Sequence, residues 1–403
     1  MENSATKLAE TTGTLEKNLR KSAIVRIGMG ALALNMPTIT LLWQEAKFSM
    51  FQTMLLQAIF SLCMAAAQMP TGYIADRLGR KLSMILGGAG LMVGDLVYAQ
   101  GNSFGDFLWA EVLMAVGLAF MSGADEALLY DTLAALGRKD EFTKRWGAYS
   151  GWAFICAAIA TTMGGLAGAY SIRLPFYMTA VAAGCLMLIS CSLVEPTRET
   201  PTSNNWRAIW RDVKEVFRLC LGNSELRRLT LFAAFLMGIN NATLWMYQPY
   251  LQMNGVAVGL WGAIFAGFNL VAAWSSQRAN LVERIFGAQA LTKLPLFLTT
   301  ASYLLLGSLA GYWSIGFALL QQAVRGFFPV LVSRHVNDRV DEKLRASIAS
   351  VRSMGERLVY ALLILPLGFL ADAQGINWAL NLGGLATLLC GMLALWALSS
   401  KRG

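Results

Sequence analysis

Apolar stretches of about twenty residues, separated by short polar segments, recur along the whole 403-residue chain. A stretch of this length, folded as an α-helix, crosses the roughly 30 Å of hydrocarbon in a bilayer. Hydrophobic residues make up 56% of the chain and charged residues 14%, against about 25% charged in an ordinary soluble domain. The alternation of apolar and polar residues typical of a membrane β-barrel is absent from the sequence. The pattern therefore predicts an all-α protein whose solvent is the lipid bilayer.

The apolar runs predict twelve membrane spans, so both termini lie on one side. The predicted spans are 24–43, 51–75, 82–100, 105–134, 147–169 and 175–194, then 229–250, 257–277, 291–310, 312–333, 346–370 and 377–398. Lys and Arg gather in the loops that this order places on one face, whereas the other face offers Lys47 and Arg173. Because basic residues near span ends are retained in the cytoplasm, we expect cytoplasmic termini in the inner (plasma) membrane of a bacterium. The net charge of +9 then belongs to these loops, which argues against nucleic acid as a partner.

A polar segment in the middle of the chain divides the spans into two groups of six. We expect a cytoplasmic tail (1–22), a first six-helix half (23–194), a linker (195–228), a second six-helix half (229–399) and a short cytoplasmic tail (400–403). In the linker, apolar residues from Trp206 to Phe217 recur at helical spacing against Arg and Lys. This pattern predicts an amphipathic helix on the cytoplasmic leaflet, although a helix packed on the bundle would share it.

Residues suited to enzyme chemistry are few. His335 is the single histidine, and the six cysteines are scattered through apolar runs without metal-ligand spacing. A metal site built from several histidines cannot be assembled from one, and a catalytic triad would have to use His335 itself. We therefore predict no catalytic residue, no metal and no cofactor, and keep an intramembrane enzyme or a receptor as remote alternatives.

The most informative string is Gly-Tyr-Ile-Ala-Asp-Arg-Leu-Gly-Arg-Lys, from Gly72 to Lys81, between the second and third spans. In such a tight basic turn, Gly79 can adopt positive φ at a helix cap, and Asp76 can face a helix N-terminus or an arginine. The string resembles motif A of the major facilitator superfamily, G-x-L-a-D-r-x-G-r-k. A weaker copy, Glu283-Arg284-Ile285-Phe286-Gly287, follows in the second half.

The resemblance implies two pseudo-symmetric six-helix halves that rock around a central site to give alternating access. It also implies that motif A forms a conformational latch on the cytoplasmic side. The latch residues implied here are Gly72, Asp76, Arg77, Gly79, Arg80 and, as an acidic partner from the fourth span, Asp131.

Two departures from the family pattern concern the direction of transport. The fourth span has no arginine, and the fifth reads Ala160 to Gly165 as Ala-Thr-Thr-Met-Gly-Gly, with the paired glycines but without the Gly-Pro of antiporters. Both departures weaken the case for drug/proton antiport. The string from Ser122 to Asp131 resembles a poorly characterised bacterial branch of the superfamily, which leaves the substrate open.

Ionisable residues inside spans are costly, so each is a functional candidate. Glu111 and Asp125 lie fourteen residues apart in the fourth span, on one helical face and about 20 Å apart, while Glu126 points about 100° away. With Glu356 in the eleventh span, these carboxylates are our candidates for proton coupling. Asp125 could instead pair with an arginine of the latch, and Glu356 with Arg352 along one helix.

Polar and aromatic residues in mid-span are the candidates for binding a substrate: Asn35, Asn240, Asn241, Trp245, Gln248, Asn269, Arg325 and Arg357. Hydrogen bonds between helices would explain the uncharged ones nearly as well. An arginine facing the cavity would favour an anionic or zwitterionic substrate. Asp95 lies near the outer end of its span, where we expect it to reach interfacial water.

The sequence as a whole predicts a monomeric secondary active transporter, coupled to protons, that moves a small organic solute across the membrane. Export is favoured, because motif A is prominent in the efflux members of the family. The alternative within the same fold is an importer or facilitator of a nutrient or metabolite.

Overall fold

The computed structural model describes residues 2–196, 224–337 and 342–399, and its regular elements there are all helical. The helices of the N-terminal part are α1 (Glu2–Gly28), η1 (Met29–Ala33), α2 (Ile39–Glu45), α3 (Met50–Leu78), α4 (Arg80–Gln100), α5 (Phe104–Met121), α6 (Ala124–Ala135), η2 (Lys139–Glu141), α7 (Phe142–Tyr170) and α8 (Leu174–Cys191). Those of the C-terminal part are α10 (Ser224–Ala242), α11 (Leu244–Met253), α12 (Val258–Gln277), α13 (Ala279–Phe286), η3 (Gly287–Leu291), α14 (Lys293–Ser308), η4 (Tyr312–Phe317), α15 (Ala318–Asn337), α16 (Glu342–Gln374) and α17 (Ile376–Ser399). The predicted amphipathic helix and the tail 400–403 lie outside the described residues.

Among the described residues, ten helices are long and apolar enough to cross a membrane. An eleventh span results if the pair Ala279–Leu291 and Lys293–Ser308, bent by 84°, is one broken span. The predicted all-α membrane fold is confirmed. The first predicted span, 24–43, is not one helix, because α1 ends at Gly28 and is followed by η1, a turn and α2. Gly28, Gly30 and Pro37 are poor helix formers, which accounts for the interruption.

The chain forms two compact units, and each takes residues from both parts of the sequence. Unit 1 comprises Met1–Leu42, Cys63–Thr202 and Val258–Ala266; unit 2 comprises Trp43–Leu62, Ser203–Ala257 and Gly267–Gly403. Compared with the predicted halves, the first part of α3 groups with α16 and the first part of α12 groups with α7. Glycines make both packings close: a methyl group on Gly368 would lie 3.0 Å from Met50 O, and one on Gly262 would lie 2.8 Å from Thr162 Cα.

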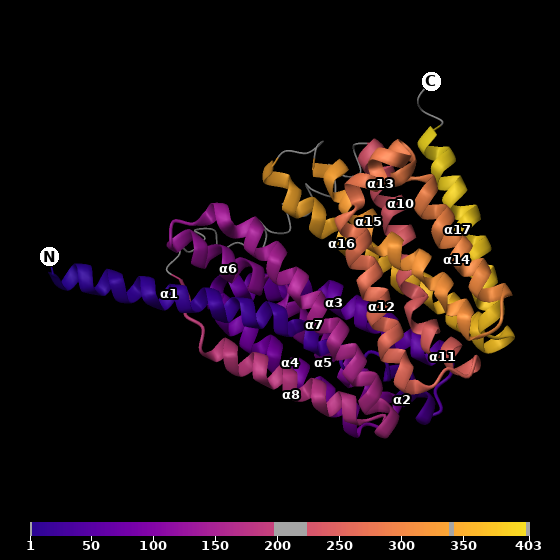
Figure 1. The fold of residues 1–403 in the computed structure, drawn as a ribbon, viewed down its shortest axis with the longest axis horizontal. Coiled ribbons are helices and arrows are strands. Elements are labelled where there is room, and N and C mark those ends of the chain that lie inside the picture. The colour runs from indigo at the N-terminus through magenta and orange to yellow at the C-terminus, as the bar shows by residue number, and fades with distance from the viewer. Residues whose placement is uncertain (1, 197–223, 338–341, 400–403) are drawn as a thin grey trace. The chain divides into compact units, whose positions relative to one another are not determined.

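In unit 1, α4 packs between α5 and α8 (Figure 1). Glycines again allow close contact, since a methyl group on Gly87 would lie 2.8 Å from the carbonyl oxygen of Gly117 on α5. Small residues at such helix contacts are typical of membrane proteins, in which packing replaces the hydrophobic effect between helices. The core of this unit is apolar, with Val25, Met84 and Leu128 fully buried.

In unit 2, α10 packs on α16 and α17, and α14 packs on α15 and α17. Phe232 on α10 meets Phe328 on α15 edge to face, with ring centroids 6.2 Å apart. Both rings are buried in one apolar cluster with Leu236 and Val324. The cluster holds the helices that carry the polar residues described below.

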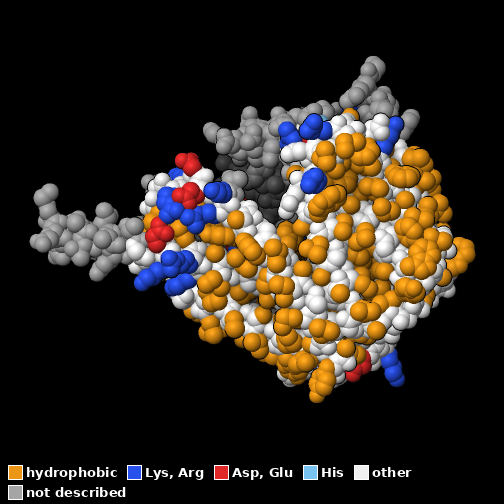
Figure 2. Space-filling view, in the orientation of Figure 1, with side chains coloured by type: hydrophobic (Ala, Val, Ile, Leu, Met, Phe, Trp, Pro, Cys, Tyr) orange, Lys and Arg blue, Asp and Glu red, His pale blue; other side chains and the backbone are white. Residues whose placement is uncertain are grey.

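Large apolar side chains cover the outside of both units. Val181 and Leu188 on α8 are 66% and 65% exposed, and Leu362 and Phe369 on α16 are 71% and 63% exposed. Figure 2 shows hydrophobic side chains over most of the drawn face, with Lys and Arg gathered near helix ends, at α1 and α6 and near α13. Apolar surface of this extent requires lipid rather than water around it.

Candidate functional site

The turn between α3 and α4 carries the motif A string in unit 1. Gly79 precedes α4 with φ of +106°, the positive φ predicted for it. Two N–H groups of the first turn of α4 donate to one carboxylate, Arg80 N to Glu195 Oε1 (2.9 Å) and Lys81 N to Glu195 Oε2 (3.0 Å). A carboxylate is favourable at a helix N-terminus, where N–H groups lack partners within the helix. A methyl group on Gly79 would lie 3.3 Å from the carboxyl carbon of Glu195.

The Arg80 side chain joins the turn to α6. Its Nη1 lies 3.1 Å from Asp131 Oδ2, with both side chains mostly buried, and its Nη2 lies 3.8 Å from Asp76 Oδ1. Arg77 instead donates to the Tyr73 hydroxyl on its own helix (3.0 Å). A methyl group on Gly72 would meet no described atom within 4 Å, so no close helix approach involves this glycine in unit 1. The structure thus brings together Asp76, Gly79, Arg80 and Asp131.

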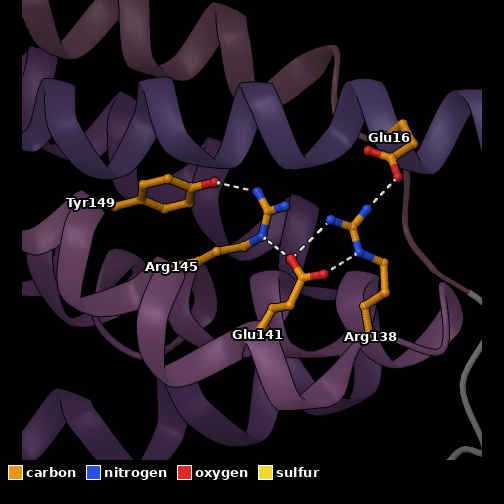
Figure 3. Close-up of polar contacts among 5 residues, drawn as sticks. All are labelled: Glu16, Arg138, Glu141, Arg145 and Tyr149. Atoms are coloured by element: carbon orange, nitrogen blue, oxygen red, sulfur yellow. Dashed lines mark hydrogen bonds and ion pairs between the residues drawn. The ribbon is translucent and has the colours of Figure 1, made fainter.

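A second group of ion pairs in unit 1 joins α1, η2 and the start of α7 (Figure 3). Arg138 donates through Nη1 to Glu16 of α1 (2.6 Å) and through Nε to Glu141 (2.6 Å). Arg145 donates to Glu141 (2.7 Å) and to the Tyr149 hydroxyl (3.2 Å). The hydrogen bond with Glu141 raises the pKa of Arg138 above its ordinary value. These contacts tie α1 to the segment that connects α6 with α7.

The weaker copy of the motif occupies the corresponding turn of unit 2. Gly287 after α13 has φ of +53°, and Glu283 Oε2 lies 3.1 Å from Arg334 Nη1 of α15. The Arg334 and Glu283 side chains are 56% and 40% exposed, against 16% and 18% for Arg80 and Asp131. Both units therefore have an acid–arginine pair beside a glycine turn, but the pair of unit 2 is open to solvent.

The fourth predicted span breaks at Ser122 and Gly123, where Gly123 has φ of +86° between α5 and α6. The prediction that Glu111 and Asp125 share one helical face is therefore wrong, because they lie on different helices. Asp125, 6% exposed, pairs with Arg26 of α1 (Nη1 to Oδ2, 3.3 Å). Glu126, next to it, is exposed.

The Arg26 guanidinium has two further partners, both on α7. It hydrogen-bonds to Ser150 Oγ (3.2 Å from Nη2) and lies 4.3 Å from the ring centroid of Trp146. The Arg26–Asp125 pair thus connects α1, α6 and α7, and the predicted pairing of Asp125 with a motif A arginine is replaced by this one.

Two buried carboxyl groups of unit 1 lie on neighbouring helices, Asp95 on α4 and Glu111 on α5. Asp95 is 1% exposed and its Oδ1 accepts from Asn35 Nδ2 at 2.7 Å. Its Oδ2 has no described hydrogen-bond partner. Glu111 is 3% exposed and accepts a hydrogen bond from the Tyr98 hydroxyl. The expectation that Asp95 reaches interfacial water is wrong, because α4 packs between two helices at this level.

A polar group in unit 2 surrounds the Tyr247 hydroxyl. The hydroxyl donates to Gln321 Oε1 (2.7 Å) and accepts from Gln322 Nε2 (3.5 Å), and Asn240 Nδ2 donates to the carbonyl oxygen of Gln321 (3.2 Å). One turn further along α15, Arg325 Nη2 donates to Asn269 Oδ1 of α12 (2.7 Å). Asn240, Asn269 and Arg325 are thereby brought together, as sequence candidates, with Tyr247 and the two glutamines.

Two of the remaining candidates of unit 2, Glu356 and Trp245, have contacts that involve α16. Arg352 pairs with Glu356 along α16 (3.4 Å), as predicted from their spacing. Trp245 donates to the Tyr360 hydroxyl (2.6 Å).

The other three candidates differ in exposure: Gln248 is buried, Arg357 is partly buried and Asn241 is exposed.

Several residues of these groups were missed by sequence reasoning. Arg26 lies close to the polar tail, where a basic residue is explained by the orientation of the chain in the membrane. Glu195 was assigned to the start of the linker. Tyr247, Gln321 and Gln322 carry no charge, so the search for buried ionisable residues passed over them. The spacing of Gln321, Gln322 and Arg325 at i, i+1 and i+4 is the one signal that could have grouped them.

Comparisons with known proteins agree with this architecture. The family model of the Major Facilitator Superfamily matches residues 23–357. The quinolone resistance protein NorA of Staphylococcus aureus (strain MSSA476) is 21% identical over 296 residues, 68% of this chain and 71% of that protein. The tetracycline resistance protein, class D, of Salmonella ordonez is 27% identical over 229 residues, 54% of this chain and 55% of that protein.

Among solved structures, the nucleoside transporter NupG superposes with a TM-score of 0.79 at 13% identity, covering 96% of this chain and all of that one. Because that identity is low, the likeness shows the fold alone. The family match spans most of the chain, and the family consists of transporters rather than enzymes. The chain is an integral membrane protein that belongs to the Major Facilitator Superfamily.

Proposed function

We propose that this chain is a proton-coupled secondary transporter that exports a small organic solute across the bacterial inner membrane. It acts as a monomer with both termini in the cytoplasm, and the group of Asp76, Gly79, Arg80 and Asp131 serves as its cytoplasmic latch. Export is supported by the relatives, whose names describe resistance to quinolones and to tetracycline. The basic helix ends support the orientation.

The observation that carries proton coupling is the Asp95 carboxyl group. It is 1% exposed, one oxygen has no hydrogen-bond partner, and no ion pair joins it to any lysine or arginine of the described residues. A bare carboxylate inside a membrane protein costs several kcal/mol. A carboxyl group in this position can bind a proton while it is secluded and release it when water reaches it. The charge of Asp95 would then follow the conformational cycle.

Glu111 extends this proton site to α5. Asp95 and Tyr98 lie three residues apart on α4, so they share a helical face, and the Tyr98 hydroxyl binds Glu111. Asp125 and Glu356 have arginine partners and Glu126 is exposed. We therefore assign coupling to Asp95 and Glu111 and a structural role to the other three.

The test is transport into inverted membrane vesicles energised by a proton gradient, with a quinolone and tetracycline as probes. Asp95→Asn keeps the size and the acceptor for Asn35 but cannot exchange a proton. We expect it to lower gradient-driven accumulation at least about tenfold, which corresponds to about 1.4 kcal/mol, and to leave solute counterflow within about twofold. Asp140→Asn, an exposed carboxylate of the same unit, is the matched control and should transport normally. Uphill transport by Asp95→Asn at the wild-type rate would refute the coupling. Accumulation of solute in right-side-out vesicles but not in inverted vesicles would refute export.

A further inference from the structure

In the described part of the chain, the Arg325 guanidinium has an uncharged hydrogen-bond partner, Asn269. It lies on α15 within a predicted membrane span, and among the described residues no carboxylate forms an ion pair with it. Its one hydrogen bond to a described residue goes to the amide oxygen of Asn269. A cation held in this way in a low-dielectric environment is costly unless an anion joins it. Arg325 is partly exposed, so a ligand can reach it.

Two buried amide atoms beside Arg325 also lack partners. Gln321 and Gln322 are 0% and 2% exposed, yet Gln321 Nε2 and Gln322 Oε1 have no hydrogen-bond partner among the described residues. The other amide atom of each glutamine forms a hydrogen bond with the Tyr247 hydroxyl. Buried polar atoms in native proteins are nearly always satisfied. One free donor and one free acceptor therefore indicate a missing polar partner.

The spacing along α15 places these free groups on one side of the helix. Gln321 and Gln322 precede Arg325 by four and three residues, the separations at which helical side chains are neighbours. The Tyr247 ring between the glutamines packs on Phe268 of α12, with centroids 5.2 Å apart. Phe268 is followed by Asn269, the partner of Arg325. Charge, free amide atoms and two buried aromatic rings thus occur together in unit 2.

We infer that this group binds an organic monocarboxylate that carries a second hydrogen-bonding group. The guanidinium pairs with the carboxylate in the bidentate geometry that arginine favours, and the amide atoms of Gln321 and Gln322 bind the second polar group. The aromatic rings accept a planar apolar body. One guanidinium balances one negative charge, so a monoanion is favoured over a doubly charged phosphate. This inference deepens the proposed function by naming the class of solute.

The test measures binding rather than transport, so it does not depend on proton coupling. Purified full-length protein in detergent is heated with nalidixate, indole-3-acetate or 1-naphthoate, each beside its neutral amide, and with inorganic phosphate. A ligand that binds the folded state raises the unfolding temperature. We expect stabilisation by at least one carboxylate, with the largest effect for a probe that has a second polar group, and none by the amides or phosphate.

Variants locate the effect. Arg325→Gln should abolish the stabilisation. Arg325→Lys should lower the apparent affinity for the carboxylate about tenfold or more, because the bidentate geometry is lost. Gln321→Leu should weaken the stabilisation while keeping the preference for carboxylate over amide. Arg284→Gln, an exposed arginine of the same unit, is the control and should bind as the wild type does.

Stabilisation by the amides equal to that by the carboxylates, a response to phosphate alone, no response to any carboxylate, or an unchanged response in Arg325→Gln would each overturn the inference. Carboxylate binding without gradient-driven transport would instead refute the proposed function, and this inference would still hold.

Discussion

Two ionisable groups without an ion-pair partner among the described residues, Asp95 in unit 1 and Arg325 in unit 2, have opposite sign. In unit 1, Asp95 is a buried acid without a cation, and Glu111 is a second buried acid on the neighbouring helix. In unit 2, Arg325 is a cation that pairs with no carboxylate of the described residues. The two units resemble each other in their glycine turns, at Gly79 and Gly287, but differ in the charges inside.

This difference suggests a division of labour between the units. A lone carboxyl group is suited to carry a proton, and a lone guanidinium is suited to hold an anion. A solute that enters as an anion and a proton that neutralises an acid each remove one uncompensated charge. The cost of leaving either charge bare would then link the two events, and the following changes test how firmly each unit holds its charges.

The largest effect on stability is expected from Arg26→Gln in unit 1. Removing one partner of a buried ion pair costs about 3–5 kcal/mol. Because the Arg26 side chain is 28% exposed and Asp125 is 6% exposed, we expect a loss of about 2–3 kcal/mol in the free energy of unfolding. Denaturation of the purified protein in mixed micelles measures it.

The double variant Arg26→Gln/Asp125→Asn serves as the control, since it removes both charges. It should recover at least half of the loss. If the single and double variants are equally unstable, the damage comes from the lost contacts with Trp146 and Ser150 rather than from a bare carboxylate.

Much of the fold could be predicted from the sequence because the composition of a membrane helix differs clearly from that of a loop. The apolar blocks and basic loops do not depend on tertiary context. Breaks inside helices do, and they were missed at Gly28 to Pro37 and at Gly123. Glycine and proline occur in membrane helices with and without breaks, since neighbouring helices can satisfy the freed backbone groups. The pattern alone therefore does not say which glycine interrupts a span.

The candidate site was predictable where the signal is local. The spacing of Arg352 and Glu356 predicted their ion pair, and the motif string predicted the positive φ of Gly79. The pairs Arg26–Asp125 and Asn35–Asp95 join residues 99 and 60 positions apart in the sequence. A single sequence does not show which residues so far apart come into contact. The misplacement of Asp95 followed from judging depth by position along a span, although burial depends on the packing of α4.

A smaller effect is expected when Arg→Gln is made in the acid–arginine pairs beside the two glycine turns. Arg80→Gln removes the partner of Asp131 where both side chains are mostly buried, and should cost about 1–3 kcal/mol. Arg334→Gln removes the exposed partner of Glu283, and should cost less than about 1 kcal/mol. Unfolding of both variants at low and high salt measures the contrast, because salt screens exposed pairs more strongly. Equal losses would show that the two turns are equivalent in energy as well as in geometry.

The smallest expected effect concerns the cap of α4. Glu195→Gln keeps two acceptor lone pairs on one oxygen but removes the charge from the helix N-terminus, and should cost about 0.5–1 kcal/mol. The corresponding helix of unit 2, α14, has Thr292 as its N-cap residue, without a side-chain hydrogen bond, so Glu283→Gln nearby serves as the control and should cost less. Hydrogen exchange of the Arg80 and Lys81 amides, which donate to Glu195, provides a local readout. Faster exchange at these two amides in Glu195→Gln, with exchange in α14 unchanged, is expected because the charge holds the start of the linker on unit 1. Unchanged exchange would mean that the geometry of the Gly79 turn alone fixes the first turn of α4.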